Sequence, residues 1–141
     1  MVRKELYERL RVVLPHHMIG LRHIDLWNRN VEFIEQEDGW EMPAVFVELM
    51  PVSWTTFKDR VYRGEGLVRL HVVTEWHSGG QEEAWRLSDS MCRGVEGLRG
   101  DGFVFQGLVE TLTNHDHEDV LETIEVFRVR YQRDTELPLP F

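Results

Sequence analysis

The densest group of potential metal ligands in this sequence is the stretch TLTNHDHEDVLE, residues 111–122. Three of its side chains, His115, His117 and Asp119, alternate along the stretch and would share one side of an extended chain. Imidazole and carboxylate groups are ligands for zinc and manganese, so these three could begin a metal site. A small metal-binding protein or a hydrolase is the function that such a site would predict.

The same stretch also has the composition of a hairpin tip. Asn, Asp and His tolerate turn geometry and bond their own backbone, and this stretch connects two segments of strand-like sequence. It lacks a fourth ligand at a diagnostic spacing, so His71 or His77 would have to supply one from elsewhere in the chain. We therefore interpret the stretch as a turn and expect no metal, no cofactor and no catalytic residue; the metal site stays the alternative.

Other candidate reactive residues have a structural explanation. Cys92 is the single cysteine, so it cannot form an intramolecular disulfide, and its place in a predicted helix favours packing over a nucleophilic role. His16 and His17 adjoin the end of another predicted helix, where imidazoles can cap carbonyl groups. The glycines at 64–66 and 99–102 lack the spacing of a phosphate-binding loop, and we read the Arg-Gly-Asp tripeptide in the second as a plain turn.

Composition indicates one compact globular domain. The chain has 141 residues, of which 42% are hydrophobic and 29% charged, and we expect a domain over residues 1–132 with a C-terminal tail over 133–141. The net charge of −9 disfavours specific nucleic-acid binding, although three arginines crowd residues 128–133. Charges throughout residues 1–15 exclude a signal peptide and a membrane span there, so we expect a protein made in the cytoplasm.

Hydrophobic periodicity predicts two helices and several strands. Helical spacing covers residues 2–14 and 81–98, and strand-like alternation covers 22–28, 44–50, 52–57, 67–76, 103–111 and 120–132. We expect charged connections over Asn28 to Met42 and over Phe57 to Glu65. This order favours an α+β fold, in which an antiparallel or mixed β-sheet has the two main helices packed on one face.

Bulky aromatic residues are numerous for a domain of this size. Burial in the core explains most of them, but a small body has limited interior, and Trp and Tyr are favoured in subunit contacts. These residues therefore favour self-association: Trp40, Trp54, Phe57, Tyr62 and Trp76.

Three phrases carry a resemblance to a known family. The runs HIDLWNRNVEFIEQEDGWEMPAVFVELMPVSW, GEGLVRLHVVTEW and TNHDHEDVLETIEVFRVRY resemble small proteins of the bacteriophage and prophage tail terminator, or tail completion, family, which is located at the head–tail neck. The likeness extends from the first predicted helix through Gln132. This family is marked by an order of elements rather than by catalytic residues, so none is carried over.

The resemblance implies a non-enzymatic virion protein. It implies an α+β subunit that assembles into a ring, commonly a hexamer, which caps the tail tube and meets the neck or connector proteins. A ring requires a contact between two different patches of each subunit, and we expect at least one of the two charged connections to reach a neighbour. It would be made in the bacterial host cytoplasm, reside in the virion, and bind neither membranes nor specific nucleic acid.

Overall fold

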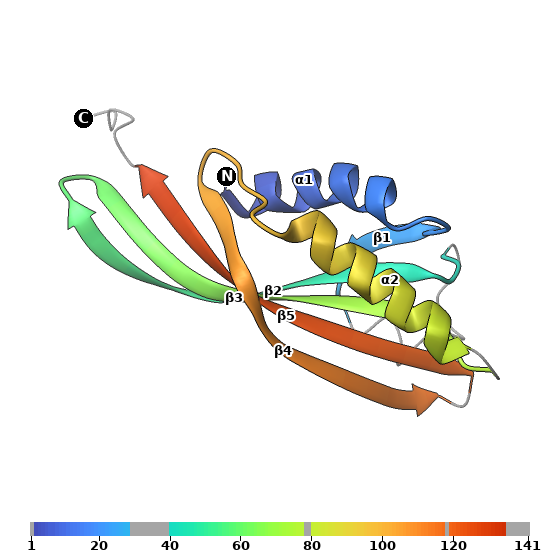
Figure 1. The fold of residues 1–141 in the computed structure, drawn as a ribbon. Coiled ribbons are helices and arrows are strands. Elements are labelled where there is room, and N and C mark those ends of the chain that lie inside the picture. The colour runs from blue at the N-terminus through green and yellow to red at the C-terminus, as the bar shows by residue number, and fades with distance from the viewer. Residues whose placement is uncertain (1, 29–39, 78–79, 118, 135–141) are drawn as a thin grey trace.

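The computed structural model describes residues 2–28, 40–77, 80–117 and 119–134, except for the side chains of residues 115–117. Seven elements follow one another along the chain (Figure 1): α1 (Val2–His17), β1 (His23–Leu26), β2 (Ala44–Lys58), β3 (Val61–Glu75), α2 (Gly80–Val95), β4 (Phe103–His117) and β5 (Val120–Asp134). The predicted α+β fold is confirmed.

The five strands form one mixed sheet in the order β1-β2-β3-β5-β4. β1 runs parallel to β2, whereas the β2–β3, β3–β5 and β4–β5 pairs are antiparallel. Both helices cover the same face of this sheet, as predicted (Figure 1). The connection after β3 passes through α2 before the chain returns as β4, so β5 lies between β3 and the edge strand β4.

α1 is longer than its predicted range. Pro15 was expected to end the helix, but the helix continues to His17, and the N–H of Met18 bonds the carbonyl of Leu14 at 2.8 Å. A proline removes one backbone donor, but the leucine stripe favours one more helical turn because that turn places Met18, only 1% exposed, in the core. α2 instead ends before its predicted limit of residue 98. It stops at Val95, two residues before Gly97, whose φ of +68° is incompatible with a continuing helix.

The largest correction concerns residues 57–65, which are not a connection. β2 and β3 are each 15 residues long and form one hairpin, in which the turn consists of Asp59 and Arg60. Arg60 has φ +63°, the left-handed geometry of a tight turn. Pro51 lies within β2 at a register shift between Leu49 and Val52, so no ladder hydrogen bond is required from it.

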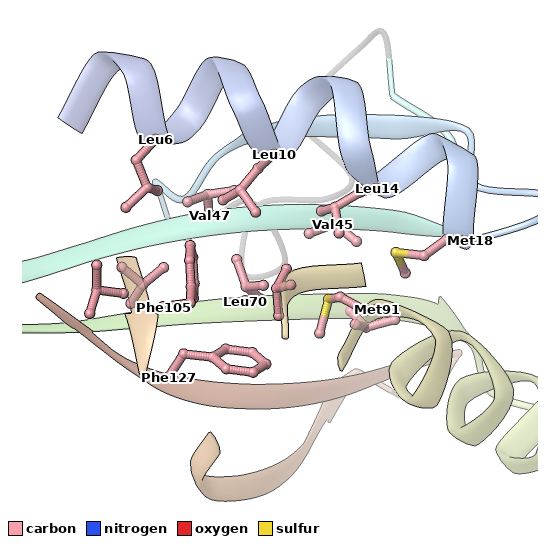
Figure 2. Close-up of a cluster of buried hydrophobic side chains, with 14 of the residues drawn as sticks. Leu6, Leu10, Leu14, Met18, Val45, Val47, Leu70, Met91, Phe105 and Phe127 are labelled. Carbon is pink, nitrogen blue, oxygen red and sulfur yellow. The ribbon is translucent and has the colours of Figure 1, made fainter. Parts of the chain in front are cut away.

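The main core lies between the helices and the sheet. Leu6, Leu10 and Leu14 point from α1 toward Val45 and Val47 of β2 (Figure 2). α2 adds Leu87, Met91 and Val95, and β5 adds Phe127 and Val129, which are all buried in the same cluster. The apolar residues whose spacing predicted these helices are therefore the ones that each helix buries.

A second, smaller cluster covers the other face of the sheet near the start of β2. Ala44, Phe46, Val73 and Val120 are buried there, and Trp27, Trp40 and Met42 pack against them. The ring of Trp40 meets that of Phe46 edge-on, with centroids 5.0 Å apart. Most of the predicted connection between residues 28 and 42 lies outside the described residues, but its last part contacts the sheet.

Truncation of Leu10 tests the main core. We expect Leu10→Ala to lower the free energy of unfolding by about 3 kcal/mol, because this fully buried side chain would leave a cavity between α1 and β2. Val12→Ala, on the same helix but 64% exposed, should change it by less than about 0.5 kcal/mol. Urea unfolding measures both; equal effects would contradict the packing of α1.

Candidate functional site

The stretch with clustered histidines ends the β4–β5 hairpin, as predicted. β4 continues to His117, β5 begins at Val120, and these two residues are register partners across the turn. Asp119 is exposed in the turn, and its carbonyl accepts a hydrogen bond of 2.9 Å from the N–H of Trp76. The side chains of His115 and His117 lie outside the described part. Among the described side chains, no three His, Cys, Asp or Glu residues converge as metal ligands.

His71 lies at the centre of a buried polar network that the sequence did not indicate. Its Nδ1 lies 2.6 Å from Glu122 Oε1 on β5, and its Nε2 lies 2.8 Å from Glu48 Oε1 on β2. The indole of Trp27 stacks on the imidazole, with ring centroids 3.9 Å apart and planes inclined by 4°. Three strands and one aromatic ring therefore hold His71 in a single orientation.

The geometry of this network suits a structural role. Both ring nitrogens face carboxylate oxygens, so both can donate only when the imidazole carries two protons and a positive charge. The side chains of His71 and Glu122 are 3% and 4% exposed, so neither can contact a ligand while the network is closed. Glu48 is 24% exposed and also lies 3.9 Å from Arg69. The alternative metal site would need His71 or His77 as a fourth ligand; both ring nitrogens of His71 instead face carboxylates within the sheet.

A second buried carboxylate, Glu125, lies under α2. Ser88 and Thr111 donate hydrogen bonds of 3.0 and 2.9 Å to its two oxygens, and the thiol of Cys92 lies 3.6 Å from Oε2. Burial, followed by the negative charge of Glu125, raises the pKa of Cys92 to about 12. A thiol with a raised pKa is a poor nucleophile. The predicted packing role of Cys92 therefore agrees with its surroundings in the main core.

The glycine runs are structural, as predicted. A Cβ on Gly64 would lie 2.8 Å from the Trp54 ring, so the glycine lets that indole lie flat across β3. Gly100 lies in the tight turn that precedes β4, where its N–H bonds the carbonyl of Phe103 at 3.0 Å. Neither run forms a phosphate-binding loop before a helix.

The most prominent surface feature is an arm formed by residues 52–66 of β2 and β3 and residues 128–134 of β5. Its outer part extends beyond the end of the two helices (Figure 1), whereas Val129 and Tyr131 at its base are buried in the main core. Stacked side chains also stiffen it: the guanidinium of Arg133 lies 4.9 Å from the centroid of the Trp54 ring, and that of Arg63 lies 3.4 Å from the centroid of Phe57. The arm is thus a built element of the fold.

The arm is basic although the chain is acidic. It carries six basic side chains, all exposed, against three acidic ones: Lys58, Arg60, Arg63, Arg128, Arg130 and Arg133 against Asp59, Glu65 and Asp134. Arg128 is paired with Glu65 at 3.2 Å. An open groove of about 650 Å³ runs along the arm, and Arg63, Arg99 and Arg130 line it together with Asp101 and Glu65. Arginines over an open groove are suited to receive carboxylate groups.

The five aromatic residues expected to favour self-association fall into two groups. Trp40 and Trp54 pack against the two clusters of buried residues. Phe57, Tyr62 and Trp76 are 49%, 37% and 36% exposed. The sequence reasoning missed Trp85, which is 62% exposed on the outer side of α2; its offset from the buried helical stripe was the signal that could have found it.

The edge of the sheet formed by β4 is poorly suited to pairing with another strand. The opposite edge is formed by the four residues of β1 and by the part of β2 that follows Val47. β4 is long, but its register with β5 shifts near Gly107, near Val109 and again near residue 115. Such bulges twist an edge and interrupt its row of hydrogen-bonding groups, which blocks strand addition. The ends of the sheet are therefore better candidates for a contact than the β4 edge.

The helices of the described chain are too short and too polar to cross a bilayer.

Removal of the His71 side chain tests the buried network. We expect His71→Ala to lower the free energy of unfolding by about 3 kcal/mol, because Glu122 would stay buried without its partner. His16→Ala, at an exposed position of α1, should change it by less than about 0.5 kcal/mol. The double variant His71→Leu/Glu122→Leu should recover most of the loss. If urea unfolding shows the same loss of unfolding free energy for His71→Ala and for His16→Ala, the network is refuted.

Alkylation of Cys92 tests its protected state. At pH 8 the folded protein should react with iodoacetamide at least about tenfold more slowly than a free cysteine, because the raised pKa keeps the thiol protonated. Glu125→Gln should increase the rate, since it removes a negative charge and a hydrogen-bond acceptor. The same protein in urea should react at the rate of the free amino acid. A folded-state rate equal to the urea rate would show that the thiol is not protected.

Comparisons with known proteins give a fold. No protein-family model matches the chain, and no curated protein matches its sequence. Among solved structures, a chain of the "Virion of native gene transfer agent (GTA) particle" is similar, with a TM-score of 0.56 and 17% sequence identity over 90% of this chain and 91% of that one. At this identity the likeness concerns the fold, and it extends over nearly the whole of both chains.

Proposed function

We propose that this chain is a non-enzymatic structural subunit of a phage-like particle, acting as a tail terminator that forms a ring at the head–tail junction. The observation that carries the proposal is the fold shared, over nine-tenths of both chains, with a component of a gene transfer agent virion. The resemblance of the three sequence phrases to the tail terminator family supports the same role independently. Together they favour a protein that works by binding.

The distribution of chemistry in the molecule agrees with a binding role. The most strongly engaged polar groups, His71 with its two glutamates and Glu125 with its three donors, are buried and hold strands and a helix together. What the surface presents is a stiff arm with exposed Arg, Phe and Tyr side chains. Aromatic and arginine side chains are enriched at the centres of protein interfaces.

A ring also explains why an arm should extend beyond the body. A cyclic assembly needs two different patches on each subunit, one that reaches out and one that receives. Residues 57–65, one of the two segments expected to reach a neighbour, lie in the outer half of the β2–β3 hairpin, which supports a contact through the arm. In the proposed particle the ring, possibly of six copies in the family pattern, caps the tail tube and meets the connector.

Solution mass and tube binding test this role. The purified chain should have a mass that is a fixed multiple of 16.7 kDa in light scattering, or should reach that state on purified tail tubes, where electron microscopy should show it at one end only. Heat-unfolded protein added to the same tubes is the control for non-specific attachment. A chain that stays monomeric at high concentration and binds no tube would overturn the proposal.

A further inference from the structure

The end of the sheet opposite the arm carries the complementary charge. Glu75 ends β3, Glu82 and Glu83 lie in the first turn of α2, and Asp119 lies in the β4–β5 turn. These elements meet at one end of the body (Figure 1). The start of α2 packs closely on the end of β3, because a Cβ on Gly80 would lie only 2.6 Å from the carbonyl oxygen of Glu75. We call these four residues the acidic end.

Two exposed tryptophans accompany the acidic end. Trp76 follows Glu75 and is 36% exposed, and Trp85 lies one turn into α2 and is 62% exposed. Acidic residues in the first turn of a helix are favoured by the helix dipole, which alone would account for Glu82 and Glu83. The dipole gives no reason for two exposed indoles in the same region. Large exposed aromatic side chains beside charges are typical of an interface.

The two surfaces match in chemistry. The arm offers arginines whose guanidinium groups can bind carboxylates and stack on indoles, and the acidic end offers both partners. Among the described residues, Arg63, Arg99 and Arg130 have no ion-pair partner within their own chain. The indole of Trp85 is the largest exposed apolar group that could enter the groove along the arm.

The two surfaces cannot meet within one molecule, because β2, β3 and β5 run from one to the other. We propose that the arm of one copy docks on the acidic end of a second copy, so that copies associate head to tail. This inference rests on the proposed ring and names its contact. A head-to-tail contact uses two different patches, which is the kind that closes a ring.

Charge reversal tests the contact through surface side chains that lie outside the core. Lys58→Glu/Arg63→Glu reverses the arm, and Glu82→Lys/Glu83→Lys reverses the acidic end. Each variant alone should associate roughly tenfold more weakly than wild type or worse, because like charges then face each other. An equimolar mixture should recover the wild-type mass, since each reversed arm meets a reversed end in an alternating ring. Lys4→Glu/Arg9→Glu on α1 changes the charge equally and should associate like wild type.

Light scattering measures the mass of each variant. Circular dichroism and thermal melting check that every variant is folded. If wild type assembles only on tail tubes, the comparison is made there. Wild-type assembly with weakened single variants and a restored mixture supports the contact. Wild-type assembly that either reversal leaves unchanged, or a mixture that is not restored, overturns the contact but leaves the ring in place. A wild type that assembles neither alone nor on tubes overturns the ring and the contact together.

Discussion

Burial of one sheet face beneath two amphipathic helices is the constraint on which the rest of the molecule depends. The helices are each 16 residues long, whereas a 15-residue strand spans roughly twice the length of such a helix because its rise per residue is larger. The strands therefore extend beyond the part of the sheet that the two helices cover. The outer part of the arm is that excess, and arginine–aromatic stacking across strands stabilises it.

The sequence predicted the parts of the fold whose faces are buried. The stripe of Leu6, Leu10 and Leu14 identified α1, and the alternation of Val68, Leu70 and Val72 identified the covered half of β3. The outer half of that strand was missed because only Val61 and Gly64 are buried in it, so no hydrophobic period marks it. Its glycines looked like loop residues, whereas Gly64 makes room for Trp54 on the paired strand.

The polar network could not be predicted for a different reason. His71 and Glu122 are 51 positions apart and His71 and Glu48 are 23 apart, so only the strand order brings them together. The spacing of possible ligands pointed to residues 115–119, where polar side chains are adjacent. The predicted hairpin there is correct, but the buried His71–Glu122 pair lies within the sheet. Likewise, the charge separation between arm and acidic end becomes visible only once strand directions are known.

The bulges along β4 have a consequence for how many copies can join. An open, regular edge lets one sheet continue into the next without limit, and such growth ends in fibres. In the proposed ring, the irregular backbone around Gly107 would close that route at the β4 edge, and contacts between side chains, whose geometry can fix a finite number, would join the copies. The irregular β4 strand therefore disfavours unlimited growth through this edge of the sheet.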